Sequence, residues 1–202
     1  MSDLADNGSS SRYHHGDLRH ALLSRAVASI EEVGTDGLSL RQLARDIGVS
    51  HGAPNRHFAD KRALLNALAI QGFALLGEAF ASAASATGFT ERMTALARIY
   101  LQFALQRPAL LGVMFTQKHS PSSDAVADAA EKAFALPISF IVEAQARGEV
   151  VHGDPKQIGL SCVATLQGLS TLLISGFVSS FTADELLSDT IKRLMIGIQP
   201  RT

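Results

Sequence analysis

Apolar side chains recur at helical spacing along almost the whole chain, and this periodicity restricts the fold more than any other feature. Near the N-terminus they repeat every four residues, at Leu18, Leu22, Ala26 and Ile30. This spacing places them on one face of an amphipathic helix, which we expect over 17–33. The alternation typical of strands is absent, and Ala and Leu dominate the composition. The chain is therefore predicted to be all-α, with about nine helices.

Residues that favour helix ends predict the remaining boundaries. Ser39 can cap a second helix, and Asp60 can cap a fourth. Pro137 should kink one of the later helices, and Thr182 with Glu185 has the spacing of a capping box. After the second helix, the expected ranges are 50–57, 61–86, 91–106, 108–116, 124–147, 155–179 and 183–198.

The composition narrows the class of protein. A chain of 202 residues that is 47% hydrophobic can form one or two domains with a real core. The polar residues 1–11 are typical of a disordered lead rather than a signal peptide. The single cysteine, Cys162, fits a reducing cytoplasm, and without zinc-finger spacing we expect neither metal nor cofactor. Residues 158–182 carry no charge but are too polar for a lipid-facing helix, so we expect a helix buried between others and no membrane partner.

The charge distribution is compatible with DNA binding but does not demand it. The formal net charge of the whole chain is −1. Between residues 12 and 62, eight Lys and Arg residues against six Asp and Glu residues give +2, and five of the seven histidines lie there. The excess of positive charge is small, so electrostatics permits this segment to meet a phosphate backbone without requiring it.

Two short helical patterns joined at Gly48 have the form of a helix-turn-helix. Ala44 is small enough for the second helix to cross the first closely, and Gly48 can adopt the positive φ of the turn. An ordinary helical hairpin has the same spacing. The second helix, however, holds compact groups and hydrogen-bond donors where a structural helix would favour Glu, Lys and Ala, which indicates contacts to DNA in the major groove. These residues are Ser50, His51, Gly52, Asn55, Arg56 and His57.

From about Tyr13 to Gly72 the chain resembles the N-terminal domain of the TetR family of transcriptional regulators. The resemblance rests on a first helix that ends in a glycine turn and on the stretch LSLRQLARDIGVSHGAPNRHFADKRALL. The C-terminal half is similar to a subgroup with a Trp and a His-Gly signature, although this chain has Gln167 before Gly168 and no Trp. The resemblance implies a DNA-binding domain over 12–62 and a helical domain over 63–202 that binds an effector and dimerises.

The resemblance also implies roles for single residues. Ser39 and Lys61 would touch phosphates on either side of the reading helix, and Arg41 and Gln42 would reach a phosphate or a base edge. Asn55 stands where the family usually has an aromatic residue, and its amide can donate to a phosphate or pair with adenine; both options stay open. The groove-facing start of the reading helix is Ser50, His51, Gly52 and Ala53.

A terminal arm precedes the first helix. We expect Arg12 and Tyr13 to track the DNA backbone. Metal binding by His14, His15 and His20 is the alternative, which we disfavour because adjacent histidines do not easily bind one metal.

The C-terminal half contains candidates for dimerisation and for effector binding. A stripe of small residues along the uncharged helix permits close helix approach, and a buried helix in a monomer is the alternative. The stripe is Ser161, Ala164, Gly168, Thr171 and Ser175. An effector pocket lined by apolar residues would favour an apolar or aromatic ligand, although each such residue is more often simple core. The candidates are Phe103, Leu110, Met114, Phe115, Phe134, Phe140 and Gln167.

Together these features predict a cytoplasmic, homodimeric repressor that binds a palindromic operator and is released by a small apolar effector. The alternative is a helical adaptor that uses the hairpin to bind another protein. An enzyme fits less well still, because the sequence has no Gly-rich phosphate loop, no paired carboxylates in a polar setting and no His next to Cys162.

Overall fold

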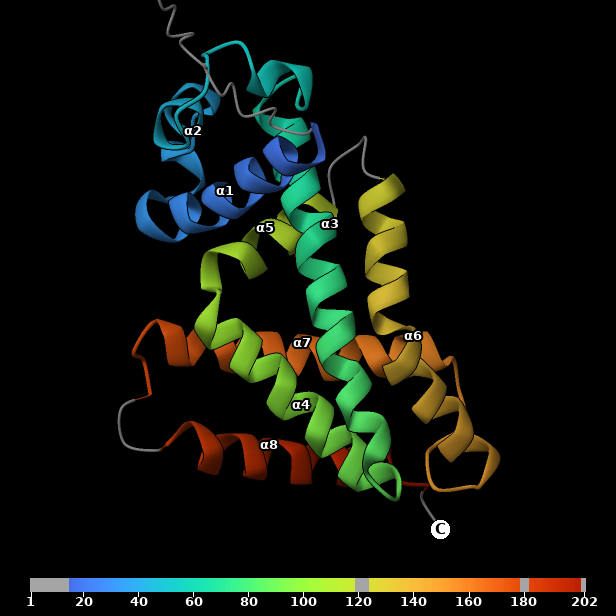
Figure 1. Cartoon of the computed structure of the whole chain (residues 1–202). Helices are drawn as coiled ribbons and strands as arrows, with labels where there is room; N and C mark the ends of the chain where they lie inside the picture. Colours follow the sequence, from blue (N-terminus) through green and yellow to red (C-terminus); the bar gives the residue numbers. More distant parts are fainter. Residues whose placement is uncertain (1–14, 119–123, 179–181, 201–202) are drawn as a thin grey trace, which may run out of the picture. The chain divides into compact units, whose positions relative to one another are not determined.

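The computed structural model describes residues 15–118, 124–178 and 182–200 of the chain. Within these ranges the protein is helical and has no strand, which confirms the predicted all-α class (Figure 1). It forms eight α-helices, close to the predicted nine, and two short 3-10 helices. The α-helices are α1 (His15–Gly37), α2 (Leu40–Asp46), α3 (Lys61–Phe80), α4 (Phe89–Gln106), α5 (Pro108–Lys118), α6 (Asp124–Ala146), α7 (Pro155–Ile174) and α8 (Ala183–Ile198), and the 3-10 helices are η1 (Pro54–Arg56) and η2 (Ala81–Ser85).

The chain divides into two compact units after Leu64. In the first unit α2 packs against α1, with Leu43 and Ala44 fully buried. The Arg25 guanidinium on α1 lies 2.8 Å from the Asp46 carboxylate, which ties α1 to the end of α2. Gly48 has a φ of 72° and forms the turn after α2, as its position in the sequence predicts.

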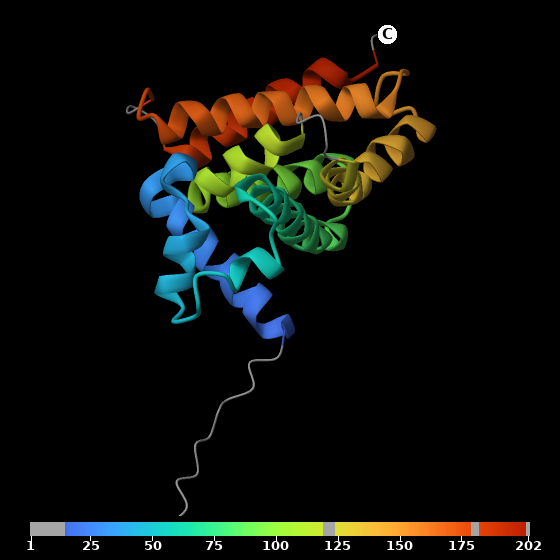
Figure 2. The same ribbon diagram turned by 90° about the horizontal axis from the view of Figure 1, so that it is seen from above.

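The second unit is built around α4, which contacts α5, α6, α7 and α8. Helices α7 and α8 pack against each other and run side by side in Figure 2. A glycine allows α3 and α6 to approach closely, because a Cβ on Gly77 of α3 would lie only 3.1 Å from the Cα of Ala133 on α6. Helix α6 changes direction part-way along its length in Figure 1, and Pro137 lies inside it.

Several predicted helix ends are confirmed by their hydrogen bonds. The Asp60 carboxylate accepts from the backbone N–H of Ala63 at 2.7 Å, at the start of α3. Thr182 and Glu185 form the reciprocal bonds of a capping box at the start of α8. Ser39 occupies the N-cap position of α2, but its side chain makes no capping bond. The predicted 1–11 lead lies outside the described residues.

Helix α7 ends earlier and is less buried than predicted. It stops at Ile174 rather than near residue 179, because Gly176 adopts a φ of 69° and turns the chain away. Both α7 and the stretch Lys61–Ser85 are long and apolar enough to cross a membrane by length and composition. In the most apolar window of α7 only 22% of the residues are buried within the chain. The expectation of a helix buried between others is therefore wrong for the isolated chain.

Candidate DNA-binding surface and ligand cavity

The segment predicted as the reading helix is a tighter turn than an α-helix. Its backbone bonds span three residues: the N–H of Ala53 donates to Ser50 O at 2.9 Å, and that of Arg56 donates to Ala53 O at 3.2 Å. Pro54 has no N–H, so it cannot make the four-residue bond to Ser50 that an α-helix would need. The prediction of an α-helix over 50–57 is wrong in type, since only Pro54–Arg56 is helical and it is 3-10.

This segment, residues 50–57, turns polar side chains outward from two buried anchors. Pro54 is buried and Phe58 is 2% exposed. The Arg19 guanidinium of α1 lies 5.4 Å from the centre of the Phe58 ring, where the ring face attracts a cation. Ala53 and His57 are half-buried. The predicted contact residues that are exposed are Ser50, His51, Gly52, Asn55 and Arg56.

Helix α2 adds further exposed polar groups beside the same turn. Ser39 and Arg41 are exposed. Gln42 is also exposed, but its amide nitrogen donates to the Asp46 carboxylate at 2.6 Å and its oxygen accepts from the Arg45 guanidinium. The bond from Gln42, with help from Arg25, lowers the pKa of Asp46. Gln42 would have to leave these bonds to reach DNA.

Lys61 has a contact that the sequence did not suggest. Its ammonium group donates to the backbone oxygen of Asp36 at 3.0 Å, and its side chain is half-buried. This bond joins the start of α3 to the C-terminal end of α1. A phosphate contact by Lys61, which stays a prediction, would compete with the bond to Asp36. No residue pattern could have revealed this contact, because it joins positions 25 residues apart.

The arm residues Arg12, Tyr13 and His14 lie outside the described part of the chain, and of His15 only its place in α1 is described. His20 is exposed, and its ring lies 3.5 Å from the Ser24 hydroxyl. Across the described ranges, no group of three or more His, Cys, Asp or Glu side chains is arranged to hold a metal ion.

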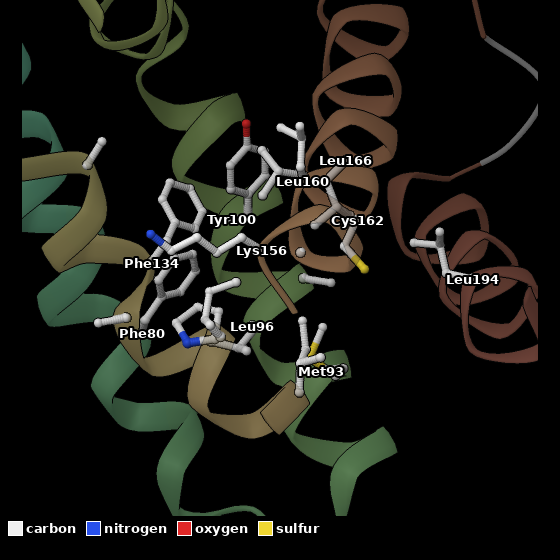
Figure 3. A pocket seen from close by; sticks show the side chains of 18 of the residues that line it. Phe80, Met93, Leu96, Tyr100, Phe134, Lys156, Leu160, Cys162, Leu166 and Leu194 are labelled. Carbon is white, nitrogen blue, oxygen red and sulfur yellow. The ribbon is translucent and has the colours of Figure 1, made fainter. Parts of the chain in front are cut away.

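An apolar cavity of about 400 Å³ lies within the second unit, with walls from α3, α4, α5, α6, α7 and α8. Figure 3 shows side chains from several of these helices around it. Four aromatic residues line it: Phe80, Tyr100, Phe115 and Phe134. Most of the others are aliphatic, including Met93, Leu96, Leu166 and Met195. A cavity of this size is in the range that encloses a small molecule.

The cavity brings together only two of the seven predicted ligand residues, Phe115 and Phe134. The other five do not line the cavity and make other contacts. Leu110 and Met114 pack over Gly72 of α3, while Phe103 and Phe140 lie under the guanidinium groups of Arg107 and Arg92. Gln167 accepts a hydrogen bond from the hydroxyl of the lining residue Tyr100.

The lining residues that were missed from the sequence include Tyr100 and Cys162. Tyr100 was available as a polar aromatic inside an apolar helix pattern, but nothing in the sequence joins it to α7. Burial raises the pKa of the Tyr100 hydroxyl and of the Cys162 thiol, so both groups are neutral near pH 7. The interior of the cavity is therefore uncharged.

Three charged residues, Lys118, Glu131 and Lys156, complete the lining. All three are exposed, so they form the rim of the cavity rather than its interior. The Lys156 ammonium group lies 3.1 Å from the Glu131 carboxylate, with both side chains largely in solvent. We call these three residues the charged rim.

The small-residue stripe of α7 lies on the outer surface of the chain. All five of its residues are exposed: Ser161, Ala164, Gly168, Thr171 and Ser175. Large apolar side chains are exposed in the same region and on α8, at Leu160 (66%), Leu172, Phe177 (79%) and Ile196. This surface combines a narrow helix face with apolar groups that water solvates poorly.

Comparisons with known proteins find family matches in both the N-terminal and the C-terminal part of the chain. Residues 22–68 match the family described as bacterial regulatory proteins, tetR family, and residues 93–194 match the tetracyclin repressor-like C-terminal domain. The class C tetracycline repressor of Escherichia coli is 45% identical over 51 residues. That alignment covers 25% of this chain and only 23% of the repressor, so it does not extend to the repressor's remaining length.

Two solved structures are similar along most of the chain. A protein of unknown function from Rhodococcus sp. RHA1 is 40% identical with a TM-score of 0.85, covering 94% of this chain and all of that one. A putative tetR family transcription regulator from Shewanella sp. PV-4 is 21% identical with a TM-score of 0.74, covering 91% of this chain and 98% of that one. The second similarity is one of fold.

Proposed function

Because the chain belongs to the TetR family of transcriptional regulators, we propose that it is a homodimeric repressor that releases a palindromic operator when a small apolar effector binds. Members of this family are DNA-binding regulators, so the chain is a transcriptional regulator and not an enzyme. The adaptor alternative, which lacks DNA binding, does not fit this membership.

The observation that carries the proposal is the exposed segment 50–57 held on the buried anchors Pro54 and Phe58. Compact residues at its start allow close approach to the floor of the major groove, while Asn55 and Arg56 extend as donors. We assign DNA binding to 12–62, with the terminal arm and the exposed residues of α2 contacting phosphates. Such contacts position the protein, and the reading segment supplies sequence preference.

The exposed face of α7 and α8 supports a homodimer. A second copy would cover the apolar groups there, and the small residues would let two α7 helices approach closely. The dimer explains why an apolar helix is so exposed in one chain, without invoking a membrane. We assign dimerisation and effector binding to 63–202, and the protein acts in the cytoplasm, where its DNA lies.

Regulation follows from the cavity as a shift between two forms of the dimer. Two reading segments must match half-sites about 34 Å apart on the DNA. An effector that binds better to a form with mismatched segments lowers the population that can bind the operator. Because α3, α4, α5, α6 and α8 line the cavity together with α7, a ligand bound in the cavity can change how these helices pack.

The test measures fluorescence anisotropy of labelled DNA from the region upstream of the gene, at several salt concentrations. Arg56→Gln should weaken binding, and it should reduce the salt slope by about one per subunit where Arg56 contacts a phosphate or reduce the preference for this DNA over random DNA where it contacts a base. Arg98→Gln is the matched control, since Arg98 is equally charged and exposed but lies on α4. A protein that binds its upstream region no better than random DNA, or equal losses in both variants, would refute the proposal.

A further inference from the structure

Charge is distributed unevenly between the interior and the rim of the ligand cavity. The interior polar groups, the Tyr100 hydroxyl and the Cys162 thiol, are both neutral because burial raises their pKa values. A ligand charge placed among the apolar side chains would lose its hydration without gaining a partner, which is strongly unfavourable. Any charged group on the ligand must therefore lie at the charged rim.

The rim favours one sign of charge. It contains two ammonium groups, on Lys118 and Lys156, against one carboxylate, on Glu131. Lys156 also lies in the first turn of α7, where the helix dipole is positive. A cationic group would meet two like charges and a carboxylate that is already paired. An anionic group would meet two cations, of which Lys156 is paired with Glu131.

We propose that the effector is an amphiphile with an apolar body and a carboxylate-like anionic head, bound with its head between Lys118 and Lys156. This inference rests on the proposed function, because it names the ligand class of the regulatory cavity. The apolar lining holds the body of the ligand, and Figure 3 shows Lys156 beside the labelled aromatic side chains of the lining.

The ion pair between Lys156 and Glu131 makes the binding step an exchange of carboxylates. Its two side chains are 73% and 69% exposed, so solvent screens the pair and it is easily opened. The anionic head of the ligand replaces the Glu131 carboxylate beside Lys156, and the Glu131 side chain rotates out into the solvent. Loss of Glu131 should then strengthen binding of an anion, whereas loss of Lys156 should weaken it.

Calorimetric titration of the protein with decanoate, decanol and decylammonium compares the affinities of an anionic, a neutral and a cationic head group on the same alkyl chain. We expect decanoate to bind about two to five times more tightly than decanol, the range of an exposed ion pair, and decylammonium to bind most weakly. In Lys118→Gln/Lys156→Gln this advantage of decanoate should disappear while decanol binds as before. Glu131→Gln should increase decanoate affinity. Lys132→Gln, an exposed neighbour outside the lining, is the control.

Ala97→Leu tests the location of binding, because Ala97 lines the interior and a larger side chain would fill it. All three probes should bind this variant more weakly, with its folding checked by circular dichroism. Equal binding of decanoate and decanol to the wild type, an advantage that survives the double Lys variant, or no binding of any probe would overturn the inference. Because these titrations contain no DNA, anisotropy with decanoate tests release separately: preferential binding without release would refute the regulatory proposal and leave the ligand class intact.

Discussion

Gly168 lies on the exposed side of α7, and replacing it with leucine separates the properties of one chain from those of a dimer. Within the chain a Cβ at this position meets nothing within 4 Å. Leucine is a better helix former than glycine by about 0.8 kcal/mol. In a single chain, Gly168→Leu should therefore raise the melting temperature by roughly 2 to 3 °C for a protein of this size.

In the proposed dimer the same change has the opposite effect. Two α7 helices that approach closely leave no room for a leucine, and overpacking costs about 1–3 kcal/mol per site. A two-fold axis repeats the substitution, so association should weaken by about 2–6 kcal/mol. That corresponds to a dissociation constant larger by roughly 30-fold to 10⁴-fold.

Analytical ultracentrifugation over a concentration series measures this constant directly. Gly112→Leu on α5 is the matched control, because Gly112 is exposed in a helix and its Cβ would also meet nothing within 4 Å. The control should melt at a higher temperature and dimerise like the wild type. If Gly168→Leu does the same, α7 does not form the interface and the argument from its small residues fails.

Three further predictions concern packing, pH and DNA reading. Gly77→Ala should lower the free energy of unfolding in urea by about 1–3 kcal/mol, because the new Cβ would lie 3.1 Å from the Cα of Ala133. This loss is expected although alanine is a better helix former than glycine, and unchanged stability would contradict the close contact. The pKa of Glu185 is lowered by the backbone N–H and hydroxyl of Thr182, so its contribution is present above its usual pKa of 4.5 and is lost as pH falls; the melting temperature of Glu185→Gln should depend less on pH in that range than that of the wild type. Asn55→Tyr, compared with the wild type on an operator and on random DNA, should change the ratio of the two affinities, and an equal change on both would exclude base reading.

The fold was largely predictable because its signals are local. Helix periodicity and the caps at Asp60 and Thr182 depend on residues within one or two turns, and the structure has the corresponding bonds. The errors arose where a local pattern was read too far. The pattern over 50–57 predicts an α-helix, but Pro54 has no N–H to donate and the helical part of the segment is 3-10. The uncharged run past Ile174 was expected to stay helical, and Gly176 ended it.

The sequence predicts that the second half of the chain holds an apolar ligand cavity, but it does not identify most of the residues that line it. Phe115 and Phe134 were identified, but Tyr100, Leu96 and the charged rim were not. The residues that line a cavity depend on which faces of separate helices pack together. The close contact between Gly77 of α3 and Ala133 of α6 is one such packing contact, and it cannot be predicted from the sequence of either helix alone. The contact of Lys61 with Asp36 likewise joins two helices and was not visible in either.

The 3-10 turn at Pro54 has a consequence for the kinetic behaviour of the DNA-binding surface. From Val49 to Asp60 most backbone bonds are short-range and near solvent, and few of them belong to a continuous helix. Such segments open locally at low free-energy cost, so their amide protons should exchange much faster than those of α4 or α6. The segment that we propose reads DNA is thus held by fewer continuous backbone bonds than the long helices in the described part of the chain. Contact with an operator would slow that exchange, and the gain in protection would report how far DNA itself completes the folding of the reading segment.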